Sequence, residues 1–284
     1  MTFRSPASRT ARRSAGKGPG VPLAPPAVAS DVYDEDYYLH WCAGFEEWET
    51  SGGSRPSALY DGSLTKARFR AGDVLVDLGT GRAELLAVAV SRGASRAVGV
   101  EYSESALQLA RRTLKASGSD ARAMVIAADS RRLPLPDSMA DLVTMLDIVE
   151  HLTPVELHHT FLEARRVLRP GGRLFAHTTP TRTVYDLTYR VQRLAVPGRR
   201  RSWPADPRVE LERVMHVNEQ TRTSLTRALR NAGFSGVAVE RGEWIHDRFV
   251  PDERARRLYH RLARHKLTGW LGIADLWAEA TRAA

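Results

Sequence analysis

The chain has 284 residues, 43% of them apolar, and a formal net charge of +9, which suits one large domain with an appendage. No stretch of about 18 apolar residues is present, so no membrane-spanning helix is predicted. Cys42 is the single cysteine, which excludes an internal disulfide and a cysteine-rich zinc site and favours a soluble protein in the reducing cytoplasm.

Residues 1–30 are predicted to form a disordered basic tail. They are rich in Pro, Gly, Ser and Ala, and they contain five basic residues but no acidic one. The tail therefore carries +5 of the net +9. Because this excess lies outside the predicted folded part of the chain, it does not favour nucleic-acid binding.

Residues 31–70 are predicted to form a helical lid. A helical stretch begins at Asp31 and carries aromatic rings at intervals of four residues, Tyr33, Tyr37 and Trp41, and "SALYDGSLTKARF" predicts a second helix. The rings either close a ligand pocket or only pack the helix onto the body of the protein.

Residues 71–284 are predicted to form the main domain. Five apolar strands alternate with helices: "DVLVDLG", "AVGVEY", "AMVIAAD", "ADLVTML" and "RLFAHTTP". This order predicts a parallel sheet covered by helices on both faces. Later in the chain, "NEQTRTSLTRALRNAGF" predicts a helix with Asn218 as its N-cap, and "SGVAVERGEW" and "GIADLWAEATR" predict two more strands.

Residues 181–215 are predicted to be an insertion after the fifth strand that covers a substrate. Tyr189 and Trp203 are expected to provide aromatic walls. The run Arg199–Arg201 either meets an anionic group or forms a solvated loop.

A glycine loop follows the first strand, with the spacing Asp77-x-Gly79-x-Gly81. At the carboxyl edge of a parallel sheet, such a turn lets the backbone approach a ligand closely. A pyrophosphate would be repelled by Asp77, because anions require N–H donors there. The carboxylate suits a ligand that carries an ammonium or a hydroxyl group.

Two more acids end the second and third strands. Glu101 lies about 20 residues beyond the loop, the separation expected of an acid that accepts hydrogen bonds from the vicinal hydroxyls of a ribose. Tyr102 can lie against a base, and Asp129 can accept a hydrogen bond from an exocyclic amine. The three acids therefore predict a site the size of a nucleoside.

Four successive segments resemble the motifs of class I S-adenosylmethionine-dependent methyltransferases: "VLVDLGTGRAELL", "AVGVEYSESALQLA", "AADSRRLPLPDSMADLVTMLDIVEHL" and "RRVLRPGGRLFAHTTP". The resemblance covers roughly residues 70–180. It implies an α/β fold with a Rossmann-like, seven-stranded, mostly parallel sheet flanked by helices, with the lid and the insertion added.

The resemblance also implies S-adenosyl-L-methionine as the cofactor. Gly79 and Gly81 would cradle its methionine portion, with Asp77 near the ammonium. Glu101 would hold the ribose hydroxyls. The remaining cofactor contacts would come from Tyr102, Asp129 and Ser130 at the adenine and from Tyr37 at the carboxylate.

The end of the fourth strand supplies candidate catalytic residues, Asp147, Glu150 and His151. Methyl transfer requires alignment of the acceptor with the methyl group and removal of a proton. His151 is the expected base, because the unperturbed pKa of histidine is close to the working pH. The alternative is a structural histidine that hydrogen-bonds a nearby loop.

A divalent metal is a further hypothesis, with Asp147, Glu150, His151 and His216 as ligands. A related spacing binds metal in small-RNA 3′-terminal ribose methyltransferases, and these ligand types suit magnesium or manganese. The tripeptide "VEH" is also widespread in relatives that need no metal, so no metal is expected.

The leading interpretation is an enzyme that methylates an oxygen or nitrogen of a small molecule, such as a sugar, polyketide, aromatic or peptide, in a bacterial secondary-metabolite pathway. One alternative is an RNA ribose 2′-O-methyltransferase with a metal-assisted site. Another is a non-catalytic protein that binds S-adenosylmethionine and acts as a partner. No membrane association is expected.

Overall fold

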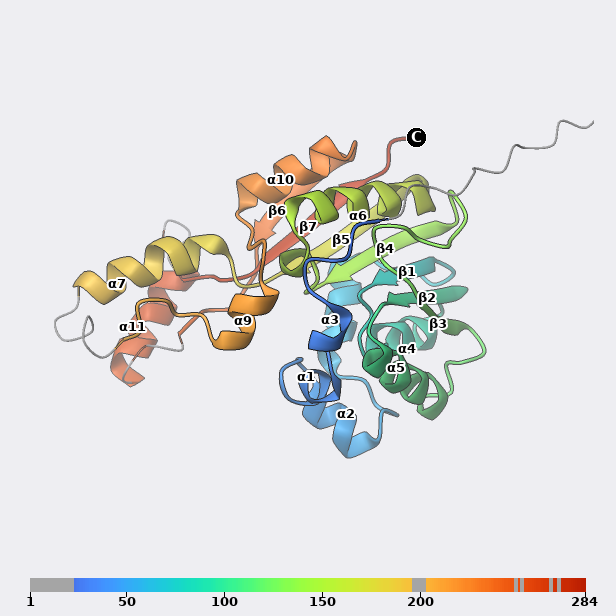
Figure 1. Ribbon diagram of the computed structural model, residues 1–284, viewed down its shortest axis with the longest axis horizontal. Helices are drawn as coiled ribbons and strands as arrows, with labels where there is room; N and C mark the ends of the chain where they lie inside the picture. Colours follow the sequence, from blue (N-terminus) through green and yellow to red (C-terminus); the bar gives the residue numbers. More distant parts are fainter. Residues whose placement is uncertain (1–22, 196–202, 248–249, 251–252, 266–267, 270–271) are drawn as a thin grey trace, which may run out of the picture.

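The computed structural model describes residues 23–284 apart from 196–202, 248–249, 251–252, 266–267 and 270–271 (Figure 1). Its strands are β1 (Val74–Leu78), β2 (Arg96–Glu101), β3 (Ala123–Ala127), β4 (Ala140–Leu146), β5 (Leu168–Thr178), β6 (Ser235–Arg241) and β7 (Leu276–Thr281). They form one seven-stranded sheet in the order β3-β2-β1-β4-β5-β7-β6. The first five strands are parallel, and β7 runs antiparallel to both β5 and β6. The predicted fold class is therefore confirmed.

Helices cover both faces of this sheet (Figure 1). The helical segments are η1 (Ser30–Val32), α1 (Glu35–His40), α2 (Phe45–Ser51), α3 (Ala58–Lys66), α4 (Glu84–Ser91), α5 (Glu104–Ala116), η2 (Val149–His151), α6 (Pro154–Val167), η3 (Val184–Tyr189), α7 (Arg190–Ala195), α9 (Glu210–Met215), α10 (Arg222–Asn231) and α11 (Glu253–Arg264). Alternate residues of β1 enter different cores: Val76 joins the cluster with α6 and α10, and Leu75 joins the cluster with α3, α4 and α5. Burial on both faces explains why the strand is apolar throughout.

Two predicted helix boundaries are wrong. The helical stretch from Asp31 is divided into η1, α1 and α2, because Arg82 donates hydrogen bonds to the carbonyls of Tyr38 and Ala43 near the break. Thr221, not Asn218, is the N-cap of α10. The backbone N–H of Asn218 instead donates to the carbonyl of Glu150, which fixes the preceding loop at the sheet edge.

The insertion and α11 form an arm beside the sheet (Figure 1). Within it, the rings of Tyr189 and Trp203 stack on each other with centroids 5.4 Å apart. The predicted run Arg199–Arg201 lies outside the described residues. No helix in the described part of the chain has the length and apolarity needed to cross a membrane.

The last residues of the predicted tail are packed. Val28 is buried, the N–H of Ala27 donates to Glu156 Oε1 at 2.9 Å, and Arg131 Nη2 donates to the carbonyl of Ala24 at 2.9 Å. Residues 23–30 therefore differ from the disorder predicted for residues 1–30, because they find polar partners on α6 and the loop after β3, and Val28 joins the apolar cluster of the N-terminal helices and α5. Residues 1–22 lie outside the description.

A buried ion pair connects the N-terminal helices to the glycine loop. Arg82 Nη2 lies 2.6 Å from Glu84 Oε2, and both side chains are almost completely inaccessible to solvent. Glu84 Oε1 also accepts a hydrogen bond from the N–H of Ser57 at 3.1 Å. Through its bonds to Tyr38 and Ala43, Arg82 ties α1 and α2 to the start of α4.

Replacement of Arg82 by Met should lower the free energy of unfolding by about 3–5 kcal/mol, because Glu84 would remain buried without its cationic partner. Urea unfolding measures this change. Arg92→Met is the control, since the Arg92–Asp61 pair is partly exposed and should contribute less than about 1 kcal/mol. Equal losses in the two variants would contradict the assignment.

Candidate functional site

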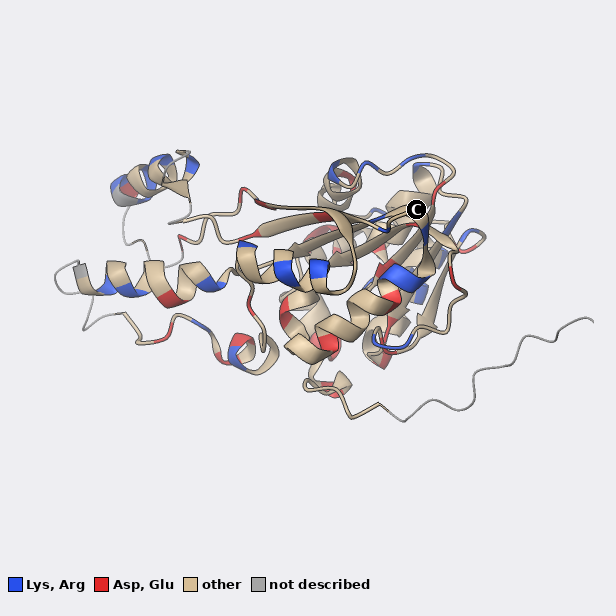
Figure 2. Ribbon diagram, turned by 90° about the horizontal axis from the view of Figure 1, so that it is seen from above, with Lys and Arg blue, Asp and Glu red and all other residues tan. Residues whose placement is uncertain are grey.

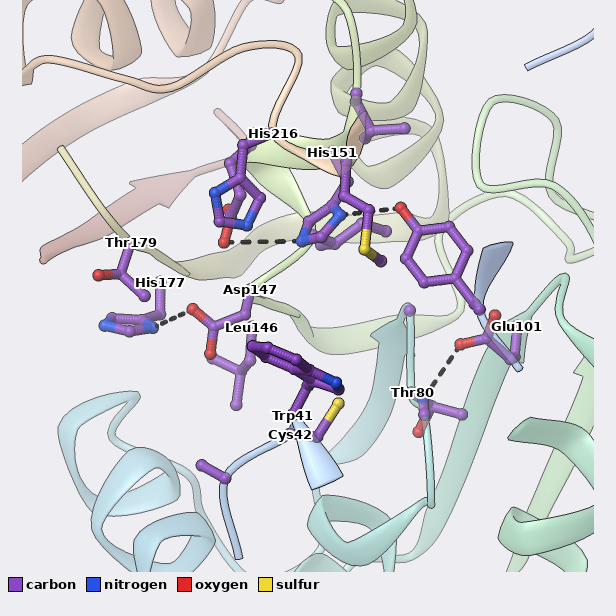
Figure 3. A pocket seen from close by; sticks show the side chains of 18 of the residues that line it. Trp41, Cys42, Thr80, Glu101, Leu146, Asp147, His151, His177, Thr179 and His216 are labelled. Atoms are coloured by element: carbon purple, nitrogen blue, oxygen red, sulfur yellow. Dashed lines mark hydrogen bonds and ion pairs between the residues drawn. The ribbon is translucent and has the colours of Figure 1, made fainter. Parts of the chain in front are cut away.

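A cavity of about 750 Å³ lies at the carboxyl ends of the parallel strands. Its walls come from the N-terminal helices, the glycine loop, the ends of β2, β4 and β5, and the start of β7 (Figure 3). Ligands of open α/β sheets bind at this edge, near the point where the strand order reverses. Here that point lies between β1 and β4.

The glycine loop lines the cavity as predicted. Gly79 has φ +71° and Gly81 has φ +52°, a backbone region that favours glycine. A Cβ on Gly79 would lie 2.8 Å from Ile148 Cδ1, so a side chain cannot be added without moving the next loop. The loop thus leaves bare backbone facing the cavity.

Glu101 is held at the cavity by three backbone donors. Its Oε2 accepts from the N–H of Gly81 at 3.1 Å, and its Oε1 accepts from the N–H groups of Tyr102 and Ser103 at 2.8 and 3.0 Å. Burial raises the pKa of Glu101, and these three hydrogen bonds oppose that effect. A carboxylate offers about four acceptor positions, so a hydroxyl donor can still bind.

Asp77 does not face the cavity. Its side chain is buried under the loop, where Oδ1 accepts a hydrogen bond from Thr144 Oγ1 at 2.6 Å. Burial raises the pKa of Asp77 to about 6. The expected direct contact of Asp77 with an ammonium is therefore not supported, and the residue links β1 to β4 instead.

The other predicted cofactor contacts all line the cavity: Tyr37, Tyr102, Asp129 and Ser130. Asp129 is paired with Arg131, whose Nη2 lies 2.6 Å from Oδ2. Tyr102 Oη donates to the carbonyl of Val28 at 3.2 Å, and Ser130 Oγ lies 3.1 Å from Thr160 Oγ1. These contacts fix the polar groups in the region predicted to hold a base.

A residue of the N-terminal segment, Tyr33, holds the His151 side chain in place. Its Nδ1 is hydrogen-bonded to Tyr33 Oη at 2.8 Å, and the two rings lie 5.6 Å apart. Burial lowers the pKa of His151 to about 3. The imidazole is therefore neutral at pH 7 and less basic than a free histidine, and the role of His151 as the base stays a prediction.

The pKa of the neighbouring acid, Glu150, is shifted in the opposite direction to that of His151. Burial and the nearby charge of Asp147 raise the pKa of Glu150 to about 8. Its Oε2 accepts a hydrogen bond from Thr178 Oγ1 at 2.7 Å, and its Oε1 lies 4.0 Å from His151 Nε2. At neutral pH this carboxyl group therefore retains its proton for most of the time.

The hypothetical metal site is brought together only in part. One ligand atom from each of Glu150, His151 and His216 lies within 4.8 Å of the others, and Nδ1 of His216 is buried without a hydrogen-bond partner among the described residues. Asp147, the fourth expected ligand, is instead bonded to His177. Three residues could thus hold an ion, but the four-residue set is not assembled.

His177 and Asp275 also line the cavity, although neither was predicted as a site residue. The aromatic side chains of the cavity differ from the predicted ones as well. His177 Nδ1 lies 2.7 Å from Asp147 Oδ1, and His177 Nε2 lies 3.3 Å from Asp275 Oδ2 (Figure 3). Burial opposes protonation, but the two carboxylates raise the pKa of His177 to about 10. The aromatic walls are Trp41, Trp244 and Trp277, whereas Tyr189 and Trp203 do not line the cavity.

A signal for His177 was present in the sequence, because this polar residue lies near the carboxyl end of the fifth predicted strand. No local signal marked Asp275. It reaches the same edge only because β7 is antiparallel, so that the start of β7 lies beside the end of β5.

Comparison with known proteins gives the family. A family model described as a methyltransferase domain matches residues 75–172. The 27-O-demethylrifamycin SV methyltransferase of Amycolatopsis mediterranei is 34% identical over 106 residues, which are 37% of this chain and 38% of that protein. A demethylmenaquinone methyltransferase of Symbiobacterium thermophilum is 33% identical over 112 residues, 39% of this chain and 44% of that protein. The chain thus spans less than half the length of these relatives.

Solved structures share the fold at low sequence identity. Geranyl diphosphate C-methyltransferase from Streptomyces coelicolor, in complex with Mg²⁺, geranyl diphosphate and S-adenosyl-L-homocysteine, has a TM-score of 0.54 and 19% identity; the match covers 80% of this chain and 78% of that chain. The [4+2]-cyclase SpnF has a TM-score of 0.55 and 18% identity, with 80% and 81% covered. The family match shows a methyltransferase domain over residues 75–172, and the curated relatives and the shared fold agree with the resemblance of the sequence to class I S-adenosylmethionine-dependent methyltransferases.

Proposed function

We propose that this protein transfers a methyl group from S-adenosylmethionine to an oxygen or nitrogen of a small-molecule acceptor. The observation that carries the proposal is the fixed carboxylate of Glu101 beside bare glycine backbone in one cavity. This pairing suits a nucleoside whose polar tail lies along the glycine loop. The name of the Amycolatopsis relative supports a role in a bacterial biosynthetic pathway.

We infer the orientation of the cofactor from the residues at the carboxyl ends of β1, β2 and β3. Gly79 and Gly81 would approach the methionine portion, and Glu101 would accept a hydrogen bond from the ribose. Tyr102, Asp129 and Ser130 would surround the adenine, since they lie on the far side of Glu101 along the sheet edge. Asp77 would support the loop from below through Thr144.

The N-terminal segment would act as the lid of this site. Tyr33, Tyr37 and Trp41 line the cavity, and Tyr33 bonds to His151. Among the described residues of the insertion, residues 181–215, those that line the cavity belong to α9: Leu211, Glu212 and Met215. We therefore propose a lid over residues 31–70 and a smaller acceptor cover from α9.

The acceptor would meet Asp147, Glu150 and His151, which line the cavity next to the loop. Methyl transfer makes the acceptor proton strongly acidic as the new bond forms, so a nearby carboxylate can accept it. The neutral imidazole of His151 and the protonated carboxyl group of Glu150 would supply hydrogen bonds without adding charge.

The charges of the cavity favour a small molecule over RNA. Its lining contains the Lys and Arg side chains Lys66, Arg82 and Arg131 together with the charged His177, and the last three of these cations are paired with acids. Over the described chain, Lys and Arg are interspersed with Asp and Glu (Figure 2). A phosphate backbone needs a continuous basic surface.

Glu101→Ala should weaken the binding of S-adenosylhomocysteine by about 1.5–3 kcal/mol, roughly 10- to 150-fold in Kd, because a hydrogen bond to a charged group is lost. Isothermal titration calorimetry measures the affinity. Glu104→Ala, an exposed acid at the start of α5, is the matched control. Unchanged affinity in Glu101→Ala would contradict the ribose assignment.

The stability difference between Glu150→Gln and the wild type should depend on pH. The pKa of Glu150 is about 8 in the folded protein against 4.5 for the free group, so the folded state holds a proton that the unfolded state releases. The contribution of Glu150 to the stability of the wild type is therefore lost as pH rises from 4.5 to 8, whereas the glutamine variant lacks this contribution at every pH. Urea unfolding at pH 5 and pH 8 should show a relative gain above about 1 kcal/mol for the variant. A constant difference would show that Glu150 is ionised in the native state.

Methyl-labelled S-adenosylmethionine, incubated with protein and a host metabolite extract, should label a small molecule that mass spectrometry identifies. Glu101→Ala should reduce this labelling strongly, and a chelator should leave it unchanged, because a sulfonium needs no metal to release its methyl group. Label found only in ribonuclease-sensitive material would support the RNA alternative. No labelled product despite cofactor binding would support the non-catalytic alternative.

A further inference from the structure

A carboxylate, an imidazole and a second carboxylate lie in line at the end of the cavity formed by β4, β5 and β7. Asp147 Oδ1 lies 2.7 Å from His177 Nδ1, and His177 Nε2 lies 3.3 Å from Asp275 Oδ2. The backbone N–H of Asp147 also donates to the carbonyl of His177 at 3.2 Å. Main chain and side chain therefore both connect Asp147 to His177.

Asp275 is the fixed end of this array. Its Oδ1 accepts from the N–H of Trp244 at 2.9 Å, and its Oδ2 accepts from Trp277 Nε1 at 3.0 Å. Its side chain is only 5% exposed. A Cβ on Gly242 would lie 1.6 Å from Oδ2 of Asp275, so the absence of a side chain at Gly242 makes room for this carboxylate. Both carboxylate oxygens of Asp275 are thus engaged by donors of the protein, and burial holds the side chain in place.

Asp147 is the open end of the array. Its side chain is 50% exposed and lines the cavity, and the hydrogen bonds of the described residues engage only Oδ1. Its φ of +54° is a left-handed conformation that costs energy for a residue with a side chain. Strain of this kind is found where a side chain must point at a ligand. Oδ2 is therefore available to a donor in the cavity.

Two tryptophans provide flat apolar surface in the same cavity. Trp41 is 55% exposed and Trp244 is 49% exposed, although both line the cavity, and Trp41 extends into it (Figure 3). The third indole, Trp277, already has the Lys66 ammonium 5.1 Å above its ring. Exposed indoles favour a ligand with a planar apolar body.

We propose that this end of the cavity binds a planar aromatic acceptor whose hydroxyl group donates a hydrogen bond to Oδ2 of Asp147. The proposal rests on the methyl transfer proposed above and names its substrate class. A hydroxyl group suits the site because it donates one hydrogen bond and keeps lone pairs on oxygen for the methyl group. Asp147 is then a catalytic residue, and His177 and Asp275 are positioning residues.

The reaction at this site forms a bond between the hydroxyl oxygen and the methyl carbon. The bond from that carbon to the cofactor sulfur breaks, and sulfur keeps its electron pair. The hydroxyl proton passes to Asp147. The products are an aryl methyl ether and S-adenosylhomocysteine, so atoms and charges balance.

The test compares 2-naphthol with its methyl ether, 2-methoxynaphthalene, which cannot donate a hydrogen bond, by equilibrium dialysis against protein saturated with S-adenosylhomocysteine. The wild type should bind 2-naphthol at least tenfold more tightly. Asp147→Gly, which removes both carboxylate oxygens and tolerates the positive φ of this position, should bind the two probes equally. Trp244→Ala should weaken both probes, and Asp120→Ala, an exposed acid on the surface, should change neither.

The positioning role is tested by two His177 variants. His177→Gln can still donate a hydrogen bond to Asp147 and should retain part of the preference for 2-naphthol, whereas His177→Phe should lose it. Equal binding of both probes to the wild type, no binding of either, or a preference that survives in Asp147→Gly would overturn the proposal. Failure to bind S-adenosylhomocysteine would instead overturn the proposed function, so the two failures are distinguishable.

Discussion

The carboxylate of Glu101 accepts three backbone hydrogen bonds, and the proposed cofactor site depends on them. The donors are the N–H groups of Gly81, Tyr102 and Ser103, which belong to the glycine loop and to the turn after β2. One buried carboxylate therefore fixes two strand ends relative to each other and still presents oxygen to the cavity. A buried acid that is hydrogen-bonded in this way is costly to move, so this carboxylate has a fixed position at the end of the cavity that we propose for the nucleoside.

At the other end of the cavity, neighbouring groups have pKa values that are shifted in opposite directions. Burial leaves His151 neutral and Glu150 protonated at neutral pH, while Asp147 and Asp275 keep His177 charged. These shifts arise from the same buried sheet edge and differ only in which partner each group meets. The charged array of Asp147, His177 and Asp275 therefore lies beside two hydrogen-bonding groups without charge, His151 and Glu150.

Much of the fold could be predicted from the sequence because local and global signals agree. Continuous apolar strands alternating with helices specify a parallel sheet, and such a sheet places Glu101, Asp129 and Asp147 at one edge. The predictions failed where tertiary contacts override the local pattern. Asp77 turned inward to Thr144, the pKa of His151 fell on burial, and Asp275 reached the edge through antiparallel pairing that no short segment reveals.

The most direct measurement of the central claim is a crystal structure of the protein with S-adenosylhomocysteine. The account predicts the ribose at Glu101, with at least one hydroxyl within about 3 Å of its carboxylate, the amino-acid tail along Gly79 and Gly81, and the sulfur facing Asp147. A cavity without density, or a ligand bound with its ribose away from Glu101, would contradict it.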